Sequence, residues 1–417
     1  MKLKLSMPSP LVFSLVAVVL LVCTNAMADR DPILSKIDPD ADPPLAPLPP
    51  PPAPPDNPIT QAKAELGMKL FFDPKMTGDA SLSCGDCHDP KQGWGFSDPI
   101  SRGYPGTVHW RNSQTVVNTA YLGKLFWQGN ANSLEAQAPI ANKGAVAGNG
   151  EDDVMEARLR QTPYYIQKFR EIFGTELPNI GDAWMAIATF ERTLNQRDTP
   201  LDRYLAGDKQ ALSEAALKGK ELFEGKANCI ECHNGPTLTD EKYYNLGVPR
   251  PLEWEEMGIN TVTFRWEAYA KGVHEKYYRN WKDDAGLYYS TKRRTDVGKH
   301  RTAPLRYLAY TAPYMHAGQF YTLEEVIDFY DEGGGDNEFT DGTHGLENKT
   351  PILKPLKLND DEKESLVIFL EEISGDEIRL KLPEVPPYGV MPDVPGLTQV
   401  RAKRIGLESY LARVAQQ

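Results

Sequence analysis

The sequence predicts a mostly α-helical protein made of two related domains, and three observations support this prediction. A Cys-x-x-Cys-His pentapeptide occurs twice, at residues 84–88 and 229–233. Each copy follows a segment with the pattern Ala-x-x-Gly-x-x-Leu-Phe, at residues 64–71 and 216–223. Both segments space their apolar residues as an amphipathic helix does, whereas the alternating pattern of strands is sparse. Duplication of one unit, a helix followed by a cysteine-containing loop, is the simplest explanation.

The pentapeptide is the attachment sequence of c-type haem. Its two cysteines hold the haem as thioethers, and the adjacent histidine binds the iron as proximal ligand. One copy is also compatible with a thiol redox or zinc site, but two copies favour a diheme protein. The expected haem-binding residues are Cys84, Cys87, His88, Cys229, Cys232 and His233. We therefore expect two cytochrome c-like domains, at residues 59–205 and 206–380, each with one covalently bound haem and with long ordered loops.

The first residues have the pattern of a secretory signal peptide. Lys2 and Lys4 precede an apolar run at residues 11–22 that is too short to span a bilayer, and an Ala-Met-Ala cleavage site follows. Cleavage after this site, at the end of residues 1–28, would remove Cys23 and leave four cysteines, all of them used by haem. We expect a periplasmic protein, with no later segment apolar enough to span a membrane.

The segments that flank the two domains lack the pattern of a core. Residues 29–58 are dominated by proline, which predicts an extended linker that acts as a spacer. Residues 381–417 are expected to form a C-terminal extension. The formal net charge is −12, and an acidic protein is a poor candidate for binding nucleic acid. It suits a basic protein partner approached electrostatically.

Three further amphipathic helices are predicted in the domains. They cover residues 182–194, residues 322–330 and residues 360–373, and the second opens with a Thr-x-x-Glu capping box. Glycine, asparagine and aromatic residues dominate residues 110–137 and 249–301. These two stretches are expected to be long loops packed around haem.

Several collinear segments resemble the diheme bacterial cytochrome c peroxidase/MauG family. The matching segments are residues 66–74, 83–90, 111–118, 126–137, 302–306, 311–318 and 322–325. They spread over most of residues 60–375 and keep the order of the family. The resemblance implies that His88 holds a high-spin haem that reacts with peroxide. It implies that His233 holds a low-spin haem that receives electrons.

The resemblance also implies roles for residues between the two haems. Trp127 matches the tryptophan that lies between the haems and is able to carry an oxidising equivalent. Asn112, Thr302 and Pro304 match the positions that supply oxygen ligands to a calcium ion. Amide and carbonyl oxygens are ligands that calcium prefers.

The sixth ligand of the second haem divides the family. Some members use methionine, whereas MauG has tyrosine at a position that Tyr330 matches here. A phenolate ligand favours ferric and higher-valent iron over ferrous iron. Met315 is the alternative ligand.

The distal pocket of the first haem departs from the family pattern. Gln137 matches a pocket glutamine, but Ala145 stands about where the acid–base residue is expected. Glu151, Asp152 or Glu135 would then have to take its place.

The histidine that closes the first iron in resting peroxidases also has no clear match. Tyr104 lies near its position and His109 follows a few residues later. We expect the first haem to stay five-coordinate or water-bound.

The predicted function is that of a periplasmic diheme c-type peroxidase, which reduces hydrogen peroxide with electrons relayed between two haems. Its partner would be a small redox protein that donates electrons. The first alternative is a MauG-like enzyme that uses peroxide to oxidise residues of a substrate protein. The second is a diheme electron carrier without catalytic activity.

Overall fold

The computed structural model describes residues 45–104, 106–251, 253–258, 263–279, 284–336 and 348–389. The predicted signal peptide, the first part of the proline-rich linker and most of the predicted C-terminal extension lie outside these ranges.

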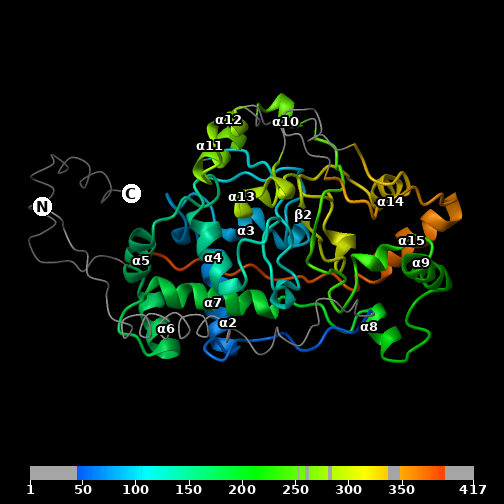
Figure 1. The fold of residues 1–417 in the computed structure, drawn as a ribbon. Helices are drawn as coiled ribbons and strands as arrows, with labels where there is room; N and C mark the ends of the chain where they lie inside the picture. Colours follow the sequence, from blue (N-terminus) through cyan, green and yellow to red (C-terminus); the bar gives the residue numbers. More distant parts are fainter. Residues whose placement is uncertain are drawn as a thin grey trace, which may run out of the picture.

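The described residues are mostly helical (Figure 1). The first half contains α2 (Gln61–Phe71), α3 (Cys84–Cys87), α4 (Leu134–Lys143), α5 (Asp152–Arg160), α6 (Pro163–Phe173), α7 (Ile180–Thr193) and α8 (Pro200–Leu205). The second contains α9 (Glu214–Glu224), β1 (Tyr243–Tyr244), α10 (Glu253–Glu256), α11 (Thr263–Ala270), α12 (Glu275–Tyr278), α13 (Tyr288–Thr291), β2 (His300–Arg301), α14 (Leu323–Asp331) and α15 (Asp360–Glu372). The predicted fold class, two cytochrome c-like domains, is confirmed.

The two copies of the sequence repeat form equivalent helix crossings. Gly67 of α2 lies against the backbone of α7, where an added Cβ would collide with the carbonyl oxygen of Ala186. Gly219 of α9 lies against α15 in the same way, facing the carbonyl oxygen of Ser365. These are the two glycines of the repeated pattern. Each lets two helices approach closely beside a cysteine-containing loop.

Each crossing lies within its own hydrophobic core. The first core is formed mainly by apolar side chains of α2, α6 and α7, and Phe71 and Phe190 are almost fully buried in it. The second core joins α9, α14 and α15, with Phe223 packed edge-on against Phe369. Two cores agree with two domains, and the residue boundaries given above stay a prediction.

The predicted amphipathic helices occur close to their expected positions. α7, α14 and α15 correspond to the three predicted ranges, and Thr322 forms the predicted capping box with Glu325. Ser213 caps α9 by accepting a hydrogen bond from the backbone N–H of Ala216.

The predicted loop at residues 249–301, in the second half of the chain, contains more helix than expected. The described part of residues 249–301 includes α10, α11, α12 and α13; the first three lie at the top of the molecule in Figure 1, and α13 lies below them. Their segments are too short for the periodicity of a helix to stand out in the sequence. β1 and β2 form an antiparallel two-stranded sheet, the only sheet in the described ranges.

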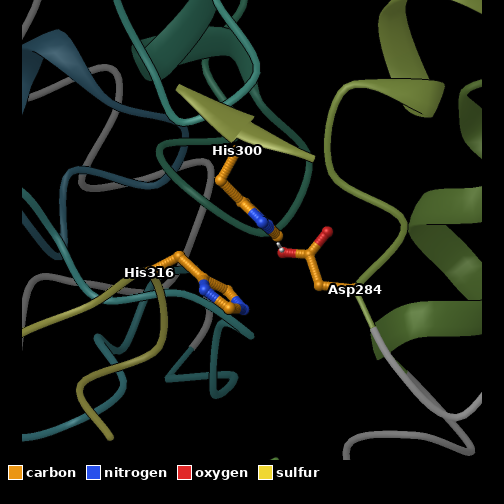
Figure 2. A group of neighbouring side chains, drawn as sticks. All are labelled: Asp284, His300 and His316. Carbon is orange, nitrogen blue, oxygen red and sulfur yellow. Dashed lines mark ion pairs between the residues drawn. The ribbon is translucent and has the colours of Figure 1, made fainter. Parts of the chain in front are cut away.

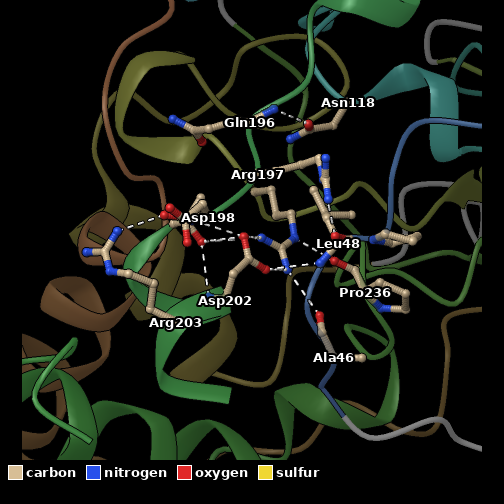
Figure 3. A network of polar contacts seen from close by, with 12 residues as sticks. Ala46, Leu48, Asn118, Gln196, Arg197, Asp198, Asp202, Arg203 and Pro236 are labelled. Carbon is tan, nitrogen blue, oxygen red and sulfur yellow. Dashed lines mark hydrogen bonds and ion pairs between the residues drawn. The ribbon is translucent and has the colours of Figure 1, made fainter. Parts of the chain in front are cut away.

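The described part of the proline-rich segment does not act as a free spacer. It is extended, but Leu45 and Leu48 are buried in the protein. The backbone N–H of Leu48 donates to Asp202, and Arg197 donates to the Leu48 carbonyl oxygen (Figure 3). Apolar leucines among the prolines explain why the segment packs instead of extending into solvent.

Residues 376–389, which we call the C-terminal segment, return from α15 along the first domain towards α5 (Figure 1). The carbonyl oxygen of Ile378 accepts a hydrogen bond from Trp94, and that of Pro386 accepts one from Lys75. The segment therefore connects the end of the second domain to the first.

A membrane-spanning helix was not expected in the mature chain. None of the helices within the described ranges is both long enough and apolar enough to span a bilayer.

Candidate functional site

One continuous cavity of ≈ 970 Å³ contacts both Cys-x-x-Cys-His motifs. The first motif reaches it from α3 and the second from a 3₁₀ turn at Cys229–Glu231. The volume lies at the upper end of the range of cofactor sites. Residues of both predicted haem positions therefore line one cavity.

The two motif histidines are held in the same way. Nδ1 of His88 lies 3.3 Å from the carbonyl oxygen of Trp94, and Nδ1 of His233 lies 3.1 Å from that of Leu238. A carbonyl oxygen only accepts, so each Nδ1 donates and each Nε2 lone pair remains available for a metal. Burial lowers the pKa of His88 to about 4 and also lowers that of His233. Both imidazoles are therefore neutral, as an iron ligand must be.

The four cysteines have the opposite character to redox-active thiols. Burial raises the pKa of Cys84 and Cys229 to about 12, and that of Cys87 and Cys232 to about 11. Thiols that exchange disulfides have a lowered pKa instead. Among the described residues no zinc-like cluster includes either motif. Both alternatives to haem attachment lose support.

Trp127 lines the cavity that contacts both motifs. Its indole N–H donates to the carbonyl oxygen of Asn112 at 3.2 Å, and its ring meets that of His316 edge-on. Its carbonyl oxygen accepts from the backbone N–H of Arg301 in β2. The first-domain loop and the sheet of the second domain thus fix its position.

Tyr330 and Met315 both contact the cavity. Tyr330 is in the last turn of α14, and its pKa is raised mainly by burial and then by its proximity to Cys229 and Cys232. This proximity places the phenol next to the second motif, as the sequence led us to expect. The structure also leaves Met315 beside the cavity, so the two predicted ligands both remain candidates.

The residues expected in the distal pocket separate into two groups. Gln137 of α4 contacts the cavity. Glu135, two residues earlier on the same helix, does not line the cavity. Its carboxylate accepts two hydrogen bonds from Arg192, at 2.6 and 2.9 Å, and one from Asn57. A carboxylate held by an arginine in this way is not free to exchange protons with a ligand.

The two other acidic residues that could replace the missing acid–base group do not line the cavity either. Glu151 and Asp152 are outside the cavity lining, and Asp152 forms a half-exposed ion pair with Lys143 at 2.6 Å. Tyr104 is outside the lining too. His109 does contact the cavity, where it stacks on Trp110 with ring centroids 4.1 Å apart.

A buried carboxyl that the sequence reasoning missed, Glu191 of α7, contacts the cavity in the first domain. Only 4 % of its surface is exposed, and burial raises its pKa to about 8. A signal was present in the sequence. Glu191 lies one helical turn after Ile187, on the apolar side of the predicted helix, where a charged residue is unusual.

A compact group of Asp284, His300 and His316 resembles a metal site at first sight (Figure 2). However, Asp284 already accepts two hydrogen bonds from Arg111, at 2.5 and 2.8 Å. The two imidazole rings stack face to face at 3.8 Å, so their in-plane lone pairs do not converge on one point. We interpret this group as a buried support for the cavity wall behind Trp127.

The predicted calcium ligands all line the cavity, but one of them already accepts hydrogen bonds from other residues. Asn112, Thr302 and Pro304 all contact it. The Thr302 carbonyl oxygen accepts hydrogen bonds from Thr239 at 2.7 Å and from the Arg301 guanidinium at 3.0 Å. A calcium ion would therefore have to displace this guanidinium, and the residues fit the ion only in part.

Comparison with known proteins identifies the family. The family described as "Di-haem cytochrome c peroxidase" matches residues 61–210. The cytochrome-c peroxidase IdrP1 of Pseudomonas sp. (strain SCT) is 51 % identical over 340 residues, which cover 81 % of this chain and 87 % of the relative. The chain belongs to the di-haem cytochrome c peroxidase family. It is an oxidoreductase of the diheme peroxidase type and carries two haems.

More distant relatives of the family agree with this assignment. The methylamine utilization protein MauG of Methylorubrum extorquens is 33 % identical, over 79 % of this chain and 83 % of that protein. A crystal structure of a MauG-like protein associated with microbial copper homeostasis has a TM-score of 0.65 and 29 % identity, and covers 79 % of this chain and 94 % of that one. The diheme peroxidase BthA of Burkholderia thailandensis, at 20 % identity and a TM-score of 0.62, supports the fold alone.

The cavity of this family member suits two haems in its charge as well as its size. Haem carries anionic propionates, and Arg301 contacts the cavity with only 3 % of its surface exposed. Its guanidinium donates only to carbonyl oxygens, those of Phe126 and Thr302, among the described residues. A buried guanidinium that donates to no carboxylate in the described part of the chain is a suitable neighbour for a propionate.

Proposed function

We propose that this chain reduces hydrogen peroxide at the haem held by His88 and receives electrons through the haem held by His233. The observation that carries the proposal is the single cavity that joins both motifs, with Trp127 on its wall. Bound haem iron would supply the redox chemistry and the coordination position for peroxide.

The residues of the chain would prepare the site for this chemistry. Trp94 and Leu238 orient the two imidazoles through their carbonyl oxygens. Gln137 offers a side-chain amide to a ligand in the first-domain part of the cavity. Trp127, held by Asn112, lines the cavity that both motifs share and would carry charge from one centre to the other.

The test is to mix the purified ferric protein with one equivalent of hydrogen peroxide. We expect a rapid change in the visible spectrum and a high-spin ferric signal in electron paramagnetic resonance of the resting protein. A diheme electron carrier would give neither. The absence of both results would therefore exclude the proposed peroxidase and favour the carrier.

A second candidate function is the peroxide-dependent oxidation of side chains on a partner protein. The observation that favours it is Tyr330, the MauG-type residue, beside the second motif. The two functions differ in the source of electrons. A small basic redox protein that is reoxidised at each turnover identifies a peroxidase, whereas a covalent change in a substrate protein identifies the second activity.

Binding of one calcium ion by Asn112, Thr302 and Pro304 is part of the proposal. The three residues contact one cavity, although Arg301 competes for the Thr302 carbonyl oxygen. Equilibrium dialysis of chelator-treated protein against calcium tests it. One bound ion per chain, lost in Asn112→Ala, is the expected result.

We also propose that the protein acts in the periplasm. The signal-like first residues support this location. Fractionation of cells that express the full chain would find the haem-containing protein in the periplasmic extract. Haem protein found only in the cytoplasmic fraction would contradict the location.

A further inference from the structure

We infer that Glu191 is the acid–base residue of the first-domain end of the cavity, the part where this chain lacks the expected acid. The inference rests on the proposed peroxide reaction and adds to it the group that moves the proton. It gives a catalytic role to a residue that the sequence analysis did not consider.

The position of Glu191 is the first argument. α7 packs against α2 with Ala186 and Phe190, and it turns Ile187 and Glu191 towards the cavity. The carboxyl group therefore shares the cavity with Gln137 of α4.

The first-motif cysteines lie close to the same wall. Cys84 Sγ is 3.9 Å from the Asn142 side chain, which places the end of α4 over the haem-binding loop. A ligand in this part of the cavity would meet α4, α7 and the loop together.

The second argument is that Glu191 has no ion pair to neutralise it within the described part of the chain. The charged groups that act on it are Arg192 beside it, Glu135 from α4 and Cys84 from the haem-binding loop. Arg192 is committed to Glu135 by two short hydrogen bonds, and a thioether-bound Cys84 carries no charge. A buried carboxyl without a cation exchanges its proton near neutral pH, as an acid–base catalyst must.

The third argument is that the other carboxyls have been accounted for. Glu135 is held by Arg192, and Asp152 is paired with Lys143 at the surface. Asp284 also contacts the cavity but is held by Arg111 and is grouped with His300 and His316. The candidate carboxyls are those suggested by the sequence and those that line the first-domain end of the cavity. Among these described residues, Glu191 alone is buried and has no ion pair.

The chemistry balances with Glu191 unchanged at the end. With haem bound, the Glu191 carboxylate would accept a proton from hydrogen peroxide and return it to the oxygen that leaves as water, with the electron pair of the broken O–O bond. The full reaction is H₂O₂ + 2 H⁺ + 2 e⁻ → 2 H₂O, with both electrons supplied by an external one-electron redox protein and the protons by solvent.

The test compares Glu191→Gln with wild-type holoprotein and with a control, Glu65→Gln, which changes an exposed glutamate of α2. Stopped-flow absorption gives the rate of reaction with hydrogen peroxide across pH 5–9. The same instrument gives the rate of cyanide binding, which requires HCN to lose a proton but involves no turnover. We expect Glu191→Gln to slow both reactions by roughly 10²–10⁴-fold, the range of general acid–base catalysis. The control should match wild type.

Two results would overturn the inference. One is that Glu191→Gln, with normal haem content, has rates of peroxide reaction and cyanide binding within about threefold of the wild-type rates, instead of the expected loss of at least about 10²-fold. If the variant does not assemble, the infrared difference spectrum of wild type with and without cyanide decides. A carboxylic C=O band that changes on binding supports the inference, and the absence of any such band contradicts it. A wild-type protein inert to peroxide would instead reject the proposed function.

Discussion

Asp202→Asn should destabilise the protein strongly, because it leaves a buried guanidinium without its counter-ion. Arg306 binds both oxygens of Asp202, at 2.7 and 3.1 Å, and the two side chains are 1 % and 6 % exposed. Arg306 also donates to the carbonyl oxygens of Pro236, just after the second haem motif, and of Ala46 in the proline-rich segment (Figure 3). One ion pair and its neighbouring hydrogen bonds thus connect four distant parts of the chain, at residues 46, 202, 236 and 306.

The expected loss is about 3–5 kcal/mol in the free energy of unfolding, the usual cost of removing one partner of a buried ion pair. Urea denaturation of the holoprotein, followed by circular dichroism and by haem absorbance, measures it. Arg203→Gln is the matched control, since Arg203 lies on the same helix but is exposed, and in the described part of the chain its side chain donates only to the Asp198 carbonyl oxygen. It should change stability by less than about 0.5 kcal/mol.

A double variant separates the lost charge pair from lost packing. Asp202→Asn with Arg306→Met removes both charges and should be more stable than Asp202→Asn alone, because no unpaired charge stays buried. A loss below about 1 kcal/mol for Asp202→Asn, indistinguishable from a surface pair, would refute the reasoning.

Four shorter predictions address the haem sites and the fold. Tyr330→Phe should change the absorption spectrum of the second ferric haem, and an identical spectrum would exclude Tyr330 as its ligand. Trp127→Phe should slow charge exchange between the haems, measured by freeze-quench spectroscopy, with haem content preserved; an unchanged rate argues against the bridging role. Gly219→Ala should cost about 1–3 kcal/mol in urea denaturation, because its methyl group meets the Ser365 backbone, and full stability would contradict the close crossing. Folded Glu191 keeps its proton longer than the unfolded chain, so its own contribution to the free energy of unfolding should fall between about pH 4.5 and about pH 8. The slopes of wild type and Glu191→Gln should therefore differ by up to about 1.4 kcal/mol per pH unit, and identical slopes would contradict this titration of Glu191.

The haem sites and the helical fold could be predicted from sequence because their signals are local. The pentapeptides are contiguous, and the repeated glycines at 67 and 219 occupy the two helix crossings. The capping box at Thr322 likewise involves neighbours three residues apart. Each of these features is specified within a few turns of chain.

The acid–base candidate could not be predicted in the same way, because its character depends on partners distant in sequence. Glu135 looked suitable until Arg192, 57 residues later, proved to bind it. Glu191 becomes a candidate only because α4 and α7 enclose it and offer it no cation. Burial and pairing of a carboxyl are properties of the folded chain and not of a sequence pattern.

The C-terminal segment gives the second domain a mechanical connection to the first iron site. Trp94 donates through its indole to the carbonyl oxygen of Ile378 and accepts, through its own carbonyl oxygen, from the imidazole of His88. Ile378 is in turn anchored by its backbone N–H to the hydroxyl of Tyr307. A shift of the polypeptide beyond α15 would thus reach the proximal imidazole through two hydrogen bonds and one side chain. The proposed peroxide-reacting centre would in this sense be tuned from both halves of the molecule.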